Sequence, residues 1–449
     1  MLLVRPPRRD ARDAGLSVPP LGLAYLAGEL RRQGRPVEIL DAYALGWGWE
    51  RFEQELDRRR PEVLGLGTMT PVADTAYRAV VVARRYAQTV VLGGPHATAL
   101  GHQVLEDCPE LDHAVAGEAE ETIGPYLDWV AGGCAGPPPA GVLARGQPFV
   151  AHQPGRPIEA IARPARDLLP TGCYRYLMAT RPGFATMLTS RGCPFRCSFC
   201  DKSVSGSTWR ARCAEDVVDE MQQLVDDGVR FVNLYDDNFT LHRKRVVAIC
   251  EALIERRLPL EWKCEGRVDG VDLELLQLMR RAGCRVVAYG VESGNAATLE
   301  LLRKDVSLER ARRAFADTRA AGLRSLAYVI LGAPGEGADE VRQSVAFVRD
   351  ELGADYVQFS SLVALPGTPL FEQHGATADV RNPLDGDLAR ATVTDLPAEE
   401  LDALMKLAWR SFYLRPQALR RLAGDALASG SWREAARLGT AMARWTLSA

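Results

Sequence analysis

The sequence predicts an α/β protein built from two parallel sheets and a small helical end. Residues 1–130 and 184–375 both alternate short β-branched runs with helical patterns, and this alternation is typical of parallel sheets covered by helices. Between them, residues 131–183 begin with a run rich in Gly and Pro that cannot sustain a helix or a central strand. We expect a connector there, with one small hairpin. Residues 376–449 end in a section rich in Ala, Leu and Arg, which predicts a helical cap.

In the first stretch we expect an open, doubly wound sheet of the Rossmann-like kind. Its strand candidates are residues 2–4, 37–40, 63–66, 89–92 and, more weakly, 114–116, and its helical patterns span residues 22–34, 50–60 and 72–87. In such sheets ligands bind beyond the carboxyl ends of the strands. Small and turn-forming residues stand at two of these ends, in residues 67–71 and 93–96.

The second stretch predicts a partial barrel of six β/α units. Its strand candidates are residues 184–189, 230–235, 260–264, 285–291, 325–331 and 355–361. The chemistry of such barrels lies at the carboxyl ends of the strands. The residues that directly follow these runs are therefore the first candidates for a site.

Composition excludes several classes of protein. The chain is 47% hydrophobic and 25% charged, which is typical of a globular protein and excludes a disordered or collagen-like one. A net charge of -3 gives no electrostatic sign of a nucleic-acid partner. No apolar run approaches the roughly 20 residues of a membrane span, and the N-terminal apolar run is too short for a signal peptide. We expect a cytoplasmic monomer with no nucleic-acid or membrane partner, whose cysteines stay reduced.

Three cysteines directly after the first barrel strand are the strongest chemical signal. Cys193, Cys197 and Cys200 have the spacing Cys-x3-Cys-x2-Cys, on a loop where a barrel presents its active site. Thiolates are soft ligands suited to zinc or to iron–sulfur clusters, and three of them leave one metal with an open coordination position. The alternative is a structural zinc site with Cys213 as the fourth ligand.

This motif, with the aromatic Phe199 just before its last cysteine, resembles the signature of the radical SAM enzymes. The resemblance implies that the three cysteines hold a [4Fe-4S] cluster whose fourth iron is chelated by S-adenosylmethionine (SAM). An external electron donor of the flavodoxin or ferredoxin type would reduce the cluster. The electron would cleave SAM to a 5′-deoxyadenosyl radical that abstracts hydrogen, and Phe199 would lie near the adenine.

Segments at later strand ends resemble the SAM-binding elements of the same family. Glu292 and Ser293 match the element that hydrogen-bonds the SAM ribose. Gly332 lies in a turn like the one that contacts the adenine, although Gly337 stands where the family often has Thr. Arg267 is the candidate for holding the SAM carboxylate as a charge-assisted fork, with a plain surface arginine as the alternative.

Asp236 and Asp237 form a pair of carboxylates at the end of the second barrel strand. We expect Asp237 to bind SAM, with capping of the following helical segment as the alternative for one of the pair. No residue is marked as a general base by the pattern. Tyr235, Asp236 and Tyr328 lie near the predicted site and are the candidate catalytic residues.

The first domain resembles the cobalamin-binding domain fused to one large subgroup of radical SAM enzymes, the class B methyltransferases. A corrinoid needs small residues where backbone meets the ring amides, and hydroxyls for hydrogen bonds. We expect the matching residues to contact cobalamin: Thr68, Met69, Thr70, Gly93, Gly94, Pro95, His96, Gly117 and Glu118. Residues 8–13 lack an Asp-x-His-x2-Gly motif, which argues against a histidine ligand below the cobalt. The alternative is a Rossmann-like sheet with no ligand.

The resemblance implies a methyltransferase that acts on a biosynthetic small molecule. One SAM would methylate cob(I)alamin, a second would give the radical, and a carbon of the substrate would take the methyl from methylcobalamin. One alternative is a related enzyme of ring closure, rearrangement or oxidation. A second is methylthiolation of tRNA or protein, which the net charge of -3 and the lone Cys108 before residue 131 oppose. A third is a non-catalytic, metal-stabilised scaffold.

Overall fold

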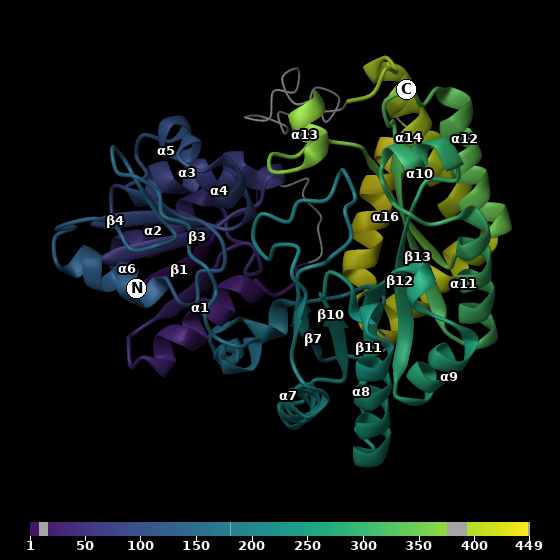
Figure 1. The fold of residues 1–449 in the computed structure, drawn as a ribbon, viewed down its shortest axis with the longest axis horizontal. Helices are drawn as coiled ribbons and strands as arrows, with labels where there is room; N and C mark the ends of the chain where they lie inside the picture. The colour runs from purple at the N-terminus through teal and green to yellow at the C-terminus, as the bar shows by residue number, and fades with distance from the viewer. Residues whose placement is uncertain (9–16, 180, 375–392, 448–449) are drawn as a thin grey trace.

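The computed structural model describes residues 1–8, 17–179, 181–374 and 393–447. Two sheets with their helices stand side by side, and the loop that carries the three cysteines lies between them (Figure 1). The C-terminal helices pack against the second sheet (Figure 1). The α/β class, the Rossmann-like first sheet, the partial barrel and the helical cap that the sequence predicts are all confirmed. The predicted boundary at residues 375/376 lies outside the described residues.

The first sheet has the strand order β2-β1-β3-β4-β5-β6, and its first five strands are parallel. The order reverses between β1 and β3, so the switch point lies at the carboxyl ends of these two strands, and the predicted ligand residues after β3 and β4 lie at it and beside it. The strands are β1 (Leu2–Arg5), β2 (Glu38–Asp41), β3 (Val63–Gly67), β4 (Thr89–Gly93), β5 (His113–Val115) and β6 (Val142–Ala144). The helices are α1 (Leu21–Arg32), α2 (Trp49–Arg59), α3 (Ala73–Ala83), α4 (Pro95–Leu100), α5 (Gln103–Asp107) and α6 (Ile123–Ala131).

The first sheet extends into the segment that the sequence assigns to the connector. β6 pairs antiparallel with β5, with Val142 opposite Val115, so a strand of the connector completes the sheet edge. The rest of the connector holds short 3-10 turns at Ile158–Ala160, Arg166–Leu168 and Thr171–Cys173. It packs tightly on α1, because a Cβ on Gly28 would lie 2.1 Å from the Arg163 carbonyl oxygen.

The second sheet is parallel throughout, with the order β14-β13-β12-β11-β10-β7. Its strands are β7 (Phe184–Met187), β10 (Phe231–Leu234), β11 (Glu261–Gly266), β12 (Cys284–Glu292), β13 (Arg324–Leu331) and β14 (Tyr356–Ser361); β8 (Ser190–Arg191) and β9 (Arg210–Ala211) form a separate small pair. The helices are α7 (Ala214–Asp226), α8 (Arg243–Arg256), α9 (Leu273–Arg281), α10 (Ala296–Leu301), α11 (Leu308–Ala320), α12 (Ala338–Ala346), α13 (Pro369–His374), α14 (Ala398–Tyr413), α15 (Pro416–Ala428) and α16 (Trp432–Leu447).

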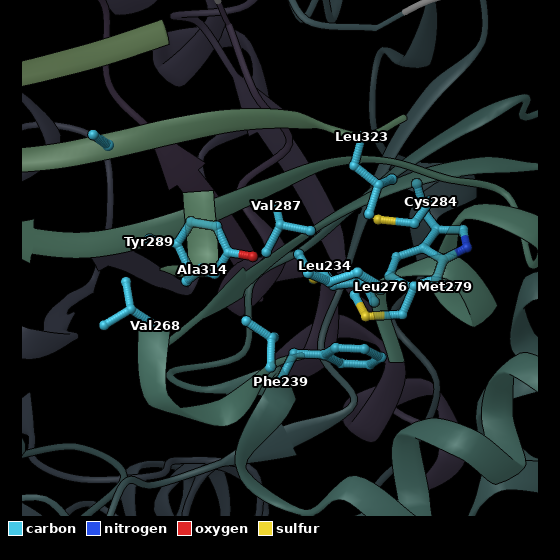
Figure 2. Close-up of a cluster of buried hydrophobic side chains, with 14 of the residues drawn as sticks. Leu234, Phe239, Val268, Leu276, Met279, Cys284, Val287, Tyr289, Ala314 and Leu323 are labelled. Carbon is cyan, nitrogen blue, oxygen red and sulfur yellow. The ribbon is translucent and has the colours of Figure 1, made fainter. Parts of the chain in front are cut away.

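A large hydrophobic core lies between the second sheet and its helices. Strand residues Leu234 and Val287 lie toward Leu276 and Met279 of α9, and Tyr289 lies toward Ala314 of α11 (Figure 2). Successive strand residues point to opposite faces of a sheet. The residues between these core positions therefore face the concave side of the barrel, here called the lumen.

None of the helices in the described part of the chain has the length and apolar character that a membrane crossing requires.

Candidate active site

The three cysteines lie on a loop that follows β8, and all three are free and half-buried. Burial raises the pKa of the Cys197 thiol, and it raises that of Cys200 to about 12, with the neighbouring thiols adding to the rise. Backbone hydrogen bonds tie the loop to the barrel: Ser198 N–H donates to the Leu302 carbonyl at 3.0 Å, and Leu370 N–H donates to the Ser198 carbonyl at 2.9 Å. Among the described residues, no three His, Cys, Asp or Glu side chains are arranged to hold a single metal ion.

Asp236 and Asp237 fix the start of this loop. The buried Asp236 carboxylate accepts hydrogen bonds from the Thr189 N–H, the Thr189 hydroxyl and the Ser190 hydroxyl. Asp237 accepts from Gly192 N–H at 2.8 Å, and burial raises the pKa of Asp237 while this hydrogen bond opposes the rise. Both Asp236 oxygens are therefore engaged by the start of the loop, and its catalytic role stays a prediction.

A charged cluster lies beside the cysteine loop at the carboxyl ends of β11 and β12. Glu292 Oε1 accepts from Lys304 Nζ at 2.7 Å, and both side chains are at least nine-tenths buried. Glu292 has a left-handed backbone with φ 66, which is uncommon for a residue other than Gly and clusters at functional sites. The Arg267 guanidinium lies 3.6 Å from the centre of the Phe195 ring, and Lys304 Nζ lies 6.0 Å from that of Phe199.

Ser293 and Gly332 belong to a buried hydrogen-bond network centred on Glu336. Gly332 N–H donates to Glu336 Oε2 at 3.0 Å, and the Ser293 hydroxyl donates to Glu336 Oε1 at 3.3 Å. Gly332 has φ 78, a conformation that Gly adopts without strain. Glu336 thus joins the turns after β12 and β13.

Tyr235 and Tyr328 face the lumen from different strands. Tyr235, at the end of β10, is 40% exposed. The Tyr328 hydroxyl donates to Glu265 Oε1 at 3.2 Å, and burial together with Glu265 raises the pKa of Tyr328 well above its usual range. The structure brings both tyrosines toward one space below the cysteine loop.

In the first sheet, the loops after β3 and β4 lie against each other. A Cβ on Gly94, at φ 98, would come within 2.6 Å of the Thr68 carbonyl oxygen, so this position requires Gly. Met69, between the two threonines, is 57% exposed. Gly93, Pro95 and Gly117 are half-buried along the same edge.

His96 lies behind this edge, only 1% exposed. Its Nδ1 is hydrogen-bonded to the Thr70 hydroxyl at 3.2 Å, and its Nε2 to the Tyr77 hydroxyl at 2.9 Å. Burial lowers the pKa of His96 to about 4. Both ring nitrogens therefore have partners within the first domain, and the cobalamin contacts of His96 and Thr70 stay predictions.

Glu118, for which cobalamin contact stays a prediction, pairs with arginines of the second domain. Arg191 Nη1 donates to Glu118 Oε2 at 2.9 Å, and Arg191 Nη2 donates to Glu120 Oε1 at 2.6 Å. Arg210 also pairs with Glu118. Arg191 lies two residues before Cys193, so the first domain directly holds the base of the cysteine loop.

The comparisons with known proteins cover nearly the whole chain. The Radical SAM superfamily profile matches residues 187–348, and the B12 binding domain profile matches residues 10–125. An uncharacterized methyltransferase of Pyrococcus horikoshii, PH0819, is 31% identical over 93% of this chain and 93% of its own length. The chain belongs to the radical SAM superfamily. The anaerobic magnesium-protoporphyrin IX monomethyl ester cyclase of Rubrivivax gelatinosus is 30% identical over 81% of this chain and 67% of its own length.

Two solved structures that are similar to this chain show the same fold. The methyltransferase TsrM of Kitasatospora setae, with cobalamin and a [4Fe-4S] cluster bound, has a TM-score of 0.67 at 21% identity and covers 84% of this chain and 74% of its own. The cobalamin-dependent enzyme OxsB, with aqua-cobalamin and SAM bound, has a TM-score of 0.73 at 16% identity and covers 98% and 71%. The predicted [4Fe-4S] cluster, SAM and cobalamin are confirmed as the groups this cobalamin-dependent radical SAM enzyme uses.

The residues of the site fit these groups. Three free thiols on one loop are soft ligands of the kind iron–sulfur clusters take. Arg267 Nη1 is buried and has no hydrogen-bond partner, which leaves a cationic donor for an anionic group. Gly117, at φ 80, has open space around its Cβ direction, and Met69 presents exposed apolar surface at the same edge of the sheet. The prediction that no histidine binds below the cobalt depends on residues 8–13. Of these, residues 9–13 lie outside the described residues.

Sequence reasoning missed several residues of the radical SAM enzyme's site. Lysine is rare in this chain, at positions 202, 244, 263, 304 and 406. Lys263 and Lys304 are almost fully buried, at 1% and 6% exposure. Their scarcity among so many arginines is the signal that could have marked them. Glu336 carried no signal beyond its place in the turn after β13.

Proposed function

We propose that this protein is a cobalamin-dependent radical SAM methyltransferase that transfers a methyl group from SAM, with cobalamin as carrier, to a carbon of a biosynthetic small molecule. When bound, the cluster, SAM and cobalamin supply a 5′-deoxyadenosyl radical and a transferable methyl group. A flavodoxin or ferredoxin type of protein serves as electron donor, and the enzyme works as a monomer.

In this proposal Cys193, Cys197 and Cys200 hold the cluster. Asp236 acts through Thr189 and Ser190 to orient the loop that carries them. Because the Asp236 and Asp237 carboxylates hold the first residues of the loop, the spacing between the thiols and the ends of the barrel strands is fixed before any ligand binds.

SAM lies against the charged cluster of Glu292, Lys304 and Arg267. The Glu292 carboxylate accepts hydrogen bonds from the ribose hydroxyls, while Lys304 balances its charge. Arg267 Nη1, the donor without a partner, binds the SAM carboxylate. Phe199 lies near the adenine, and the buried network of Glu336 holds Ser293 and Gly332 in the turns that shape this end of the site.

Cobalamin lies at the carboxyl edge of the first sheet. Thr68, Met69, Gly93, Gly94, Pro95 and Gly117 form the surface that receives it. α4 lies next to the barrel at this point, since a Cβ on Gly367 would lie 3.4 Å from the Ala99 Cβ. The two ligand edges therefore face each other across the cysteine loop, a position in which water can be kept away from radicals.

The observation that carries the proposal is this junction: Arg191, at the base of the cysteine loop, is held by Glu118 and Glu120 at the carboxyl edge of the first sheet. The similarity to the P. horikoshii methyltransferase along 93% of both chains supports methyl transfer as the outcome.

Labelled SAM tests the proposal. The full chain is reconstituted anaerobically with iron, sulfide and cobalamin, then incubated with methyl-labelled SAM, a reductant and a small-molecule extract of the host cells. We expect a small molecule that gains the labelled methyl group. Formation of 5′-deoxyadenosine with no labelled product would overturn the proposal.

The second candidate is a radical cyclase or oxidase with the same cofactors, which the 30% identity to the R. gelatinosus cyclase favours. The same incubation separates the two functions. A cyclase yields a product that has lost hydrogen and carries no label.

A further inference from the structure

The lumen of the barrel carries a polar cluster that the SAM and cobalamin sites do not use. Its members come from three strands: Asn233 on β10, Lys263 and Glu265 on β11, and Tyr328 on β13. Lys263 Nζ pairs with Glu265 Oε1 and lies 3.4 Å from Asn233 Oδ1. The Tyr328 hydroxyl donates to the same Glu265 oxygen at 3.2 Å.

One carboxylate oxygen of this cluster has no hydrogen-bond partner. Lys263 is 1% exposed and Glu265 is 19% exposed at the side chain. Glu265 Oε1 receives both Lys263 and Tyr328, whereas Glu265 Oε2 is buried with no hydrogen-bond partner. A buried acceptor left without a donor costs free energy, and nearly all such groups in proteins are paired. The free oxygen therefore points to a ligand that donates a hydrogen bond.

The surroundings of the free oxygen are aromatic. Tyr176 of the connector stacks on Phe184 with ring centres 5.1 Å apart and interplanar angle 8°. Burial raises the pKa of Tyr176 well above its usual range, and Tyr328, Glu265 and Tyr235 lie near enough to contribute to that rise. Tyr328 thus contacts the cluster through its hydrogen bond to Glu265, and Tyr176 and Tyr235 lie near it.

The cluster borders the charged site beside the cysteines. Tyr328 lies opposite Gly290 in the pairing of β12 with β13, two residues before the proposed ribose-binding residue Glu292. On β14, the alternate residues Gln358 and Ser360 are exposed, which leaves polar side chains at the edge of the lumen. A molecule held at Glu265 would lie next to the place where hydrogen is abstracted.

Charge decides which kind of donor fits. Lys263 already balances the carboxylate of Glu265, so a neutral hydroxyl or N–H leaves the buried cluster neutral. An ammonium group would add an uncompensated positive charge in a poorly hydrated space.

We infer that the lumen recognises the substrate through a neutral hydrogen-bond donor, a hydroxyl or N–H on an apolar or aromatic body, which donates to Glu265 Oε2. Lys263 and Tyr328 hold the carboxylate in place. This inference rests on the proposed function only in naming the bound molecule as the substrate.

Three isosteric probes test it by ligand-observed NMR titration of the reconstituted full chain. Benzyl alcohol carries a neutral donor, anisole has the same atoms without a donor, and benzylamine carries a cation. We expect benzyl alcohol to bind about tenfold more tightly than anisole, the effect of one hydrogen bond to a charged group, and more tightly than benzylamine.

A variant then locates the binding. The preference for benzyl alcohol should disappear in Lys263→Met/Glu265→Leu, which removes both charges together. It should persist in the matched control Arg312→Met/Glu351→Leu, which removes an exposed pair. Equal binding of anisole, tightest binding of benzylamine, no saturable binding of benzyl alcohol, or a preference that survives in the lumen variant would overturn the inference.

The comparison of the three probes on the wild-type chain holds even if the lumen variant fails to fold. Because these titrations need no turnover, failed methyl transfer with intact probe selectivity would contradict the proposed function alone. Methyl transfer without probe selectivity would contradict this inference alone.

Discussion

Replacing Arg191 by Met tests whether the ion pairs between the domains hold the cysteine loop. The Arg191 side chain is 8% exposed, and its partners Glu118 and Glu120 are 5% and 9% exposed. Burial alone would lower the pKa of Arg191, but Glu120 and Glu118 raise it above its usual value. The substitution would leave two buried carboxylates and remove their shared cation.

The expected loss of unfolding free energy depends on which carboxylate loses its partner. Breaking a buried ion pair costs about 3–5 kcal/mol, because the remaining charge is uncompensated. Glu118 keeps Arg210, so Glu120 alone is stranded. We therefore expect the lower end of that range, about 3 kcal/mol of unfolding free energy.

Urea unfolding followed by tryptophan fluorescence measures this cost. The control is Arg312→Met on an exposed pair, for which we expect less than about 1 kcal/mol. Removing the stranded charge as well, in Arg191→Met/Glu120→Gln, should recover at least about 1 kcal/mol. An Arg191→Met variant no less stable than Arg312→Met, or a double variant less stable than Arg191→Met, would contradict a stabilising role of these ion pairs.

Three further predictions concern single residues. After anaerobic reconstitution, Cys197→Ala should have lost most iron binding and the SAM-dependent change in the EPR spectrum. The control Cys213→Ala, which replaces an exposed cysteine, should change neither. Equal loss in both variants would favour the zinc alternative. Glu292→Gln should weaken SAM binding by roughly tenfold, measured by equilibrium dialysis, and unchanged affinity would contradict the ribose assignment. Burial lowers the pKa of His96 from 6.5 to about 4. Between these pH values His96 is protonated in the unfolded chain and neutral in the native protein. The unfolding free energy should therefore fall as the pH drops from about 6.5 to about 4, by about 3 kcal/mol more in wild type than in His96→Gln. Urea titrations across this pH range measure it, and an equal pH dependence of the unfolding free energy in the two proteins would count against the prediction.

The strands could be predicted from the sequence because each is a short β-branched run between turn residues. All five parallel strands of the first sheet and all six of the second lie where the periodicity indicates. The sequence did not predict β6, because its run Val142–Ala144 is short and follows Gly and Pro. These residues are unfavourable in a strand interior and argue against a strand there.

Side-chain partners were less predictable than strand positions. Glu118 and Arg191 are 73 residues apart, and local periodicity carries no information about such a contact. Asp236 was predicted as a catalytic candidate and His96 as a cobalamin contact from their places at strand ends. Their partners Thr189, Ser190, Thr70 and Tyr77 become visible only in three dimensions.

The yields of labelled product and 5′-deoxyadenosine, measured in one incubation with methyl-labelled SAM, test radical methyl transfer at this site most directly. For radical methyl transfer we expect both products in equal amounts from the reconstituted full chain and neither from Cys197→Ala. Deoxyadenosine without labelled product, or labelled product that survives in Cys197→Ala, would contradict it.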